Sequence, residues 1–476
     1  MSSSISALKS YAVEMDQRDE VNAIPRSMLP ARIARPVSAF KSIKNLTPIS
    51  GSSITSGGQT TVQLPFGAGS GYMKAGSGYL RFRFSATQTA NTFGFAGSIP
   101  SAQSLIQRIT VAQNNNIELI NEYGKLVSNV IYPYCTSSSY QNNIALMEGG
   151  LGSNAYQSLT FSSGALGSTT SYVAGLTNVV AMTDPRSAFV STGAGGAMAV
   201  EFSVPIMCGL FNNKELSFIP LELMSSPLTI TIDWATVNNA IFAITTAVSE
   251  YACSSIQFVY ESVSPPVEYT NELRAGLMQG RVWSIPYTTV ISAQTQNNSS
   301  VSYNMSLNAS SVDAFFYGAT QSFNANTSTL TQKCFASATG SSIAGDFTTV
   351  NRRLYADGNL VNSVPSLNSD TMLVREMLRA VEGGFVSDVY QTPPFSTVGT
   401  NGTSGQPLGT LRSQFYCGGF NLKPFFEENL AMAGTPVSVL NFQKDDYSGA
   451  DGILYMYAFV SNIAVIDASG AISVIR

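Results

Sequence analysis

Carboxylate pairs are the side chains whose type and spacing come closest to a catalytic site in this 476-residue chain. They stand at Glu427-Glu428 and Asp445-Asp446. Two carboxyl groups that flank a glycosidic bond can hydrolyse it, one of them acting as the acid. Adjacent residues in a strand point to opposite faces, however, and adjacent residues in a loop usually face solvent. We therefore expect neither pair to be catalytic.

Other catalytic and ligand-binding patterns are missing from the sequence. The chain has no histidine, which excludes a Ser-His-Asp triad, a Cys-His pair and a HExxH zinc site. It has no GxxxxGK[ST] phosphate loop and no calcium loop of alternating acids. Its five cysteines are far apart and never in a CxxC spacing, which is typical of reduced, buried thiols. We expect no enzyme, no cofactor and no metal site.

The composition favours a protein with large contacts between subunits. Charged residues make up only 11% of the chain, while apolar residues make up 44% and the mean hydropathy is +0.11. Interfaces between subunits are depleted in charge at their centres, so extensive contacts would explain these values. A secreted adhesin rich in hydroxyl groups would share them. The net charge of -4 argues against a nucleic-acid footprint that covers the whole chain.

Residues 1–50 are predicted to form an arm. Several prolines interrupt any long helix in this segment, and its second half carries five positive charges without an acid. The functional interpretation is an extended arm on the inner face of a shell, in contact with the genome, a membrane or a neighbouring subunit. The alternative is an ordinary solvated leader. The five candidate contact residues are Arg26, Arg32, Arg35, Lys41 and Lys44.

Short β-strands separated by long polar loops are predicted from about residue 60 onward. Apolar and polar residues alternate with period two, most clearly in residues 80–84 and 228–234. Many short strands with such loops favour a sandwich or jelly roll over an α/β fold. The other predicted strands are 117–120, 197–205, 256–260, 282–287, 301–307, 312–317, 454–460, 463–467 and 472–475.

The layout of strands, helix, loop and strands occurs twice. Pro265-Pro266 is the natural boundary between residues 51–265 and residues 266–476. Each part contains one predicted helix and one long loop rich in glycine and hydroxyl groups. The helices are predicted at 121–131 and 369–381, and the loops extend to about residue 196 and over 387–409. Residues 149–183 carry no charge but lack the continuous apolar run of a membrane span, so they are predicted to be part of the first loop.

Several segments resemble the double jelly roll major capsid proteins of virophages, Polinton-like viruses and the tectivirus-adenovirus lineage. The first segment contains a short helix, a strand and an "E-x-I-x-x-Y-x-x-L" helix start. The second contains a strand followed by a "P-L-x-x-G-L" turn, with Ile206 in place of the leucine. An "L-P-L" turn, with Ile219 for the first leucine, and the last connection between strands follow in order. These segments are residues 101–111 with 117–126, 202–211, 218–223 with 227–230, and 419–422 through 433–434.

The resemblance implies an all-β protein of two tandem eight-stranded jelly rolls, with a structural role in the virion capsid. It implies a homotrimer that forms a pseudo-hexameric capsomer of an icosahedral DNA-virus shell and is assembled inside the host cell. Neighbouring capsomers, penton proteins and minor capsid proteins would be the partners, and the arm would reach packaged DNA or an inner membrane. The alternative from another class is a β-rich carbohydrate-binding adhesin or a phage tail fibre protein.

Overall fold

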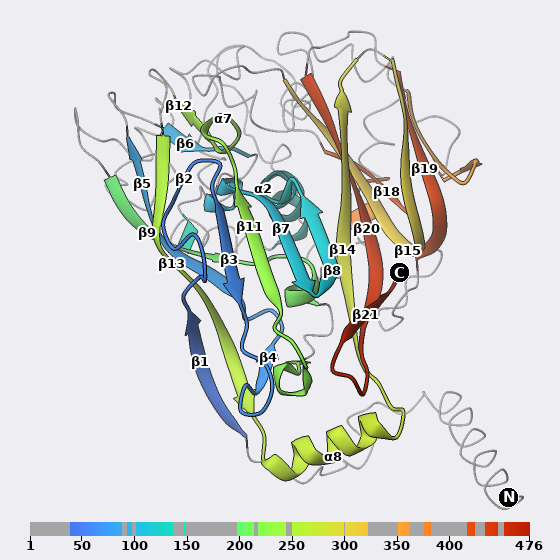
Figure 1. Ribbon diagram of the computed structural model, residues 1–476. Coiled ribbons are helices and arrows are strands. Elements are labelled where there is room, and N and C mark those ends of the chain that lie inside the picture. Colours follow the sequence, from blue (N-terminus) through green and yellow to red (C-terminus); the bar gives the residue numbers. More distant parts are fainter. Residues whose placement is uncertain are drawn as a thin grey trace, which may run out of the picture. The chain divides into compact units, whose positions relative to one another are not determined.

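The structure is a computed structural model that describes residues 39–87, 93–97, 101–136, 147–148, 198–213, 218–243, 250–298, 300–321, 351–361, 376–377, 379–381, 417–423, 434–445 and 452–476. Met1–Ala39 and Phe40–Arg476 are two separate units, and only the last residue of the first unit is described. The second unit consists mainly of antiparallel β-sheet (Figure 1).

Strands between Phe40 and Ser264 form what we call the N-terminal half. Its 7-stranded sheet contains β1 (Phe40–Leu46), β2 (Ile54–Thr55), β4 (Tyr72–Lys74), β5 (Tyr79–Thr87), β9 (Met198–Pro205), β10 (Phe218–Ile219) and β13 (Glu250–Ser264). Its 4-stranded sheet contains β3 (Gln59–Gln63), β7 (Ile106–Gln113), β8 (Asn115–Asn121) and β11 (Thr229–Trp234). A 2-stranded sheet pairs β6 (Phe93–Phe95) with β12 (Ile241–Ala243).

Strands between Trp283 and Ile475 form the C-terminal half. They make one 8-stranded sheet: β14 (Trp283–Gln296), β15 (Ser300–Gln321), β16 (Asn351–Ala356), β17 (Asn359–Leu360), β18 (Gly418–Asn421), β19 (Thr435–Asp445), β20 (Gly452–Ile466) and β21 (Ile472–Ile475). No described strand of one half pairs with a strand of the other.

The two halves repeat one pattern of strand pairing. In the N-terminal half the hydrogen-bonded strands follow the orders β1-β13-β5-β9 and β3-β11-β7-β8. In the C-terminal half they run β14-β20-β15-β18 and β15-β19-β16-β17. The long strand β15 therefore takes the places of both β3 and β5. The repeat that the sequence indicated only by its layout thus extends to individual strand pairs.

Long strands account for the main differences from the predicted elements. The predicted strands 301–307 and 312–317 are both parts of β15, which continues through two register shifts. Asn308 adopts a left-handed conformation (φ 48°) at the first shift, so a residue typical of turns lies within a bulged strand. The predicted strands 454–460 and 463–467 likewise join in β20.

A helical segment follows β8, as predicted for residues 121–131. It consists of α2 (Tyr123–Leu126), a π-helical turn η3 (Val127–Ile131) and α3 (Tyr132–Cys135). Of the second predicted helix, residues 376–377 and 379–381 are described and are helical. Short helices occur at η2 (Ala102–Leu105), η4 (Leu210–Asn212), η5 (Leu221–Leu223) and α7 (Val237–Ala240).

Helix α8 (Val267–Met278) was not predicted. It begins directly after Pro266, whose fixed φ suits a helix start, and it connects β13 to β14 (Figure 1). Arg274 of this helix donates to the carbonyl of Glu222 at 3.0 Å. A helix thus connects the two halves.

The predicted arm needs a correction at its end. Residues 40–46 form β1, which pairs along its whole length with β13, so the last part of the predicted segment 1–50 belongs to a sheet. The stretch 149–183 and the loop 387–409 lie outside the described residues.

Candidate functional site: the seam between the two halves

One hydrophobic core crosses from the N-terminal half into the C-terminal half. Strand β20 alternates between two cores: Tyr455, Tyr457 and Phe459 join the core of the N-terminal half, while the residues between them join a second core inside the C-terminal half. Ile285 and Tyr287 of β14 also belong to the shared core. Because β20 is buried on both faces, it has a nearly continuous apolar sequence rather than strict alternation. We call this contact region the seam.

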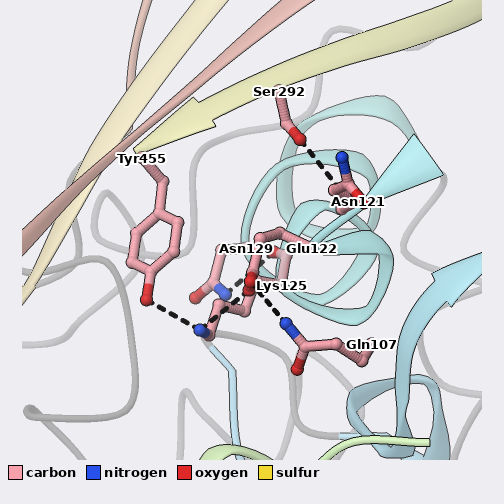
Figure 2. A network of polar contacts seen from close by, with 7 residues as sticks. All are labelled: Gln107, Asn121, Glu122, Lys125, Asn129, Ser292 and Tyr455. Carbon is pink, nitrogen blue, oxygen red and sulfur yellow. Dashed lines mark hydrogen bonds and ion pairs between the residues drawn. The ribbon is translucent and has the colours of Figure 1, made fainter. Parts of the chain in front are cut away.

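Lys125 is the charged centre of the seam (Figure 2). Its Nζ lies 2.9 Å from Oε2 of Glu122 and donates to the hydroxyl of Tyr455 at 2.7 Å. The same Nζ lies 4.4 Å from the centroid of the Tyr455 ring, a cation–π distance. The side-chain amide of Gln107 donates to the Glu122 carboxylate. An ion pair of the N-terminal half is therefore bound directly to β20 of the C-terminal half.

The backbone around Lys125 is held in place by two further hydrogen bonds. Asn129 donates its side-chain amide to the carbonyl of Lys125 at 2.9 Å, one helical turn along the segment. Ser292 of β14 donates to the carbonyl of Asn121 at 3.2 Å, again across the seam (Figure 2). Glu122 between them has a left-handed conformation (φ 52°), which turns the chain from β8 into the helical segment.

The pKa of Lys125 reflects two opposing effects. Burial by itself would lower the pKa, because it disfavours the charged ammonium. Interactions with Tyr455 and Glu122 outweigh burial and raise the pKa above its ordinary value. Lys125 is therefore charged at neutral pH, and its charge is compensated within the seam.

Glu118 is a second polar group of the seam, and it is almost completely buried. Its Oε2 accepts the backbone N–H of Leu210 at 2.9 Å, and its carboxyl group also hydrogen-bonds the side chain of Thr289 on β14. Burial raises the pKa of Glu118 to about 7, and these two hydrogen bonds oppose the rise. Gly209 has φ +87°, and a Cβ there would overlap the carboxylate. A glycine is thus required for the turn to close over Glu118.

The turn between β20 and β21 makes a third polar contact. Gln113 at the end of β7 donates to the carbonyl of Gly470 at 3.1 Å and accepts the N–H of Ile472 at 2.7 Å. The backbone of Ser225 donates to the same Gly470 carbonyl at 3.2 Å. Gly470 has φ +72°, and a Cβ there would lie 2.6 Å from the Ser225 nitrogen. The contact therefore requires a close approach of two backbones.

The residues predicted from sequence are not brought together at the seam. Lys41 lies in β1, where its Nζ is 2.8 Å from Glu261 of β13, and Lys44 is exposed on the same strand. Asp445 is exposed at the end of β19 and accepts the hydroxyl of Ser300 at 2.9 Å. The rest of the predicted residues, namely Arg26, Arg32, Arg35, Glu427, Glu428 and Asp446, lie outside the described residues.

The described part of the chain offers no obvious ligand site. It contains no group of three or more Cys, Asp or Glu residues placed to hold a metal ion, and none of its helices is long and apolar enough to span a membrane. The cysteines at 135, 208, 253 and 417 are free thiols, three of them buried and Cys135 half-buried. Glu118 is the first residue of the "E-x-I-x-x-Y-x-x-L" segment noted in the sequence, but neither its burial nor that of Lys125 was predicted, since a single charge in a strand or helix carries no signal of burial.

Comparison with known proteins identifies the fold. No family model and no curated protein sequence matches the chain. A cryo-EM structure of the Sputnik virophage matches with 13% identity and a TM-score of 0.55, covering 95% of this chain and 92% of the other. The Faustovirus major capsid protein matches at 9% identity (TM-score 0.54; 92% of both chains), and the mavirus major capsid protein at 12% (0.52; 95% and 94%). The fold is the double jelly roll, as predicted.

Proposed function

We propose that this protein is a major capsid protein that forms trimeric, pseudo-hexameric capsomers of an icosahedral DNA-virus shell and catalyses no reaction. The observation that carries the proposal is the repeated strand pairing, joined by a buried seam, in a fold shared with viral major capsid proteins. Three copies of two similar halves give six similar corners, which a ring with threefold symmetry can present to its neighbours.

The strand pairing supports limits for the two proposed jelly rolls. The pairing supports a first jelly roll that starts at β1, near residue 40 rather than 51, and ends before Pro265. It supports a second jelly roll in residues 266–476, with α8 as the connection. Each chain would lie in the capsid of the virion with its two jelly rolls side by side, and the capsid would be assembled inside the host cell.

The mass of the purified protein in solution tests the proposal. A species of about 152 kDa, three times the chain mass of 50.6 kDa, with a hexagonal outline in electron-microscopic class averages is expected. A monomer, or an elongated trimer, would contradict the capsomer. Either result would favour the alternative of a carbohydrate-binding adhesin or tail fibre protein.

The partners of the capsomer would be other capsomers, penton proteins and minor capsid proteins. Residues 1–38, with Arg26, Arg32 and Arg35, would contact packaged DNA, an inner membrane or a neighbouring capsomer. Deleting residues 1–38 is expected to weaken assembly of capsomers into shells while leaving the thermal unfolding of the protein unchanged. Normal shell assembly by the truncated protein would show that this segment is not an assembly arm.

A further inference from the structure

A second buried carboxyl group belongs to Glu148, whose side chain is fully buried in the N-terminal half. The hydroxyl of Tyr132 in α3 donates to this carboxyl group, at 2.7 Å from Oε1 and 2.9 Å from Oε2. The side chains of Ser101 and Gln103 also hydrogen-bond Glu148. One acid therefore joins three segments of the chain: residues 147–148, the start of η2, and α3.

The amide of Gln103 indicates which form of Glu148 completes this network. Its nitrogen donates to the Tyr132 hydroxyl at 2.9 Å and to the carbonyl of Pro205 in β9 at 2.8 Å. Its oxygen is buried and accepts no hydrogen bond from the described residues. Tyr132 has a single proton, which it already donates to Glu148. A protonated Glu148 carries an O–H group, so the neutral acid can donate to the oxygen of Gln103.

The surroundings of Glu148 also favour the neutral acid. The groups that hydrogen-bond it are the neutral side chains of Ser101 and Gln103 and the hydroxyl of Tyr132, and none of them is a cation. A buried carboxylate without a cation is costly, and such a group usually binds a proton instead. Burial accordingly raises the pKa of Glu148 to about 8, although the hydrogen bonds oppose the rise.

Helix α3 connects this network to the seam. Thr136 donates its hydroxyl to the carbonyl of Tyr132 at 2.7 Å, which secures the end of the helix. Between these two residues, Tyr134 is buried and hydrogen-bonds the backbone of Cys417, which lies directly before β18 of the C-terminal half. The same short helix is therefore held by Glu148 through Tyr132 and by the C-terminal half through Tyr134.

We propose that Glu148 is a proton-dependent clasp, which holds α3 against η2 and β9 while it is protonated and releases α3 when its proton is lost to solvent. Folding raises the pKa of Glu148 from 4.5 to about 8, so the clasp is fully closed below pH 4.5. It weakens as the pH rises through 8, and the contact of α3 with the C-terminal half weakens with it. The inference does not depend on the proposed capsomer.

Hydrogen exchange of the wild type and of E148Q, compared at the same pH, tests the inference. Glutamine stays neutral, and its amide can donate to Gln103 while its oxygen accepts from Tyr132. The exchange rate of the amides in residues 132–136, wild type relative to E148Q, should increase at least about 30-fold between pH 5 and pH 8. Glu118 is present in both proteins, so its contribution cancels. E268Q is the matched control, because Glu268 is exposed on α8, and this variant should exchange like the wild type.

A ratio of exchange rates that stays constant with pH would overturn the clasp. Infrared difference spectra give a second measurement, because the wild type minus E148Q at pH 6 should contain the C=O stretching band of a neutral carboxylic acid. Absence of this band would show that Glu148 is ionised. If E148Q did not fold, Y132F would decide: it removes a hydrogen bond that favours the carboxylate, so the band should titrate at higher pH than in the wild type. An unchanged titration would contradict the network.

Discussion

The outer faces of the two equivalent sheets have opposite chemistry. In the C-terminal half, the face of β15 and β20 that meets the N-terminal half carries Phe316, Tyr457 and Phe459, all fully buried. In the N-terminal half, the equivalent face of β5 carries Arg81 and Arg83, both exposed. The strand pairing is the same, so the difference arises from what each face meets rather than from the fold.

The difference follows from whether the same chain covers the face. A face that is always covered by the same chain can be apolar, since it never meets water in the folded state. A face that meets water is favoured by charges, and here Arg81 pairs with Glu201 on the neighbouring strand. Three variants test this contrast between the two faces and the seam that covers one of them.

Removing a ring from the apolar face should have the largest effect. Phe459 is fully buried and its ring centroid lies 5.1 Å from that of Phe316. Phe459→Ala should lower the free energy of unfolding by about 4 kcal/mol, as buried phenylalanines generally do. Arg83→Ala on the equivalent face of β5 is the control, with a change within about 0.5 kcal/mol. Urea denaturation of the two variants measures both values, and similar losses would refute the contrast.

Removing the charge at the centre of the seam should have the next largest effect. Lys125→Met leaves the carboxylate of Glu122 without its cation in a region where both side chains are largely buried. The expected loss is about 3 kcal/mol of unfolding free energy. The double variant K125M/E122Q removes both charges and should recover most of this loss. Stability no better in the double variant than in K125M would show that the ion pair is not what Lys125 contributes.

The effect of Glu118 comes last because it depends on pH and vanishes at low pH. Its pKa is raised from 4.5 to about 7 in the folded protein, so folding favours the protonated form. The contribution of Glu118 to the free energy of unfolding is therefore fully present at low pH and is lost as the pH rises from about 4.5 through 7.

Glu118→Gln should remove this loss of stability with rising pH. Glutamine stays neutral, so the variant should match the wild type at about pH 3.5, below the ordinary pKa of a glutamate, and exceed it by on the order of 3 kcal/mol at pH 9. Glu148 is also buried, with its pKa raised to about 8, so the wild type retains a second pH-dependent group. The difference between wild type and variant, measured by thermal unfolding across this pH range, isolates Glu118. A difference that is constant with pH would contradict its titration.

Local patterns predicted the strands well where one face is buried and the other is solvated. The alternation in residues 228–234 corresponds to β11, whose residues alternate between half-buried and buried, and the residues after β8 form the expected helix. Prediction failed where the chain departs from this simple case. Bulges hid the continuity of β15, and Pro265-Pro266 concealed the helix that starts immediately after them.

Strand β8 shows why the seam could not be predicted. Simple alternation in Ile-Glu-Leu-Ile would place Leu119 inside and Glu118 outside. In the structure Leu119 is 42% exposed and Glu118 is only 4% exposed, because Glu118 lies opposite Val111 on the core face. Leu210 and Thr289, both distant in sequence, supply hydrogen bonds to this buried carboxyl group, and its raised pKa reduces the cost of burying a charge.

The all-β class, the duplicated layout and the exclusion of histidine-dependent catalysis could be inferred from the sequence alone. These follow from local periodicity and from which residue types are present. Contacts between residues distant in sequence establish which strands are continuous, bury Glu118 and Lys125, and cover β14 while β1 is exposed. The physical reason is that periodicity shows which residues share a face, but the free energy of each residue depends on what covers that face.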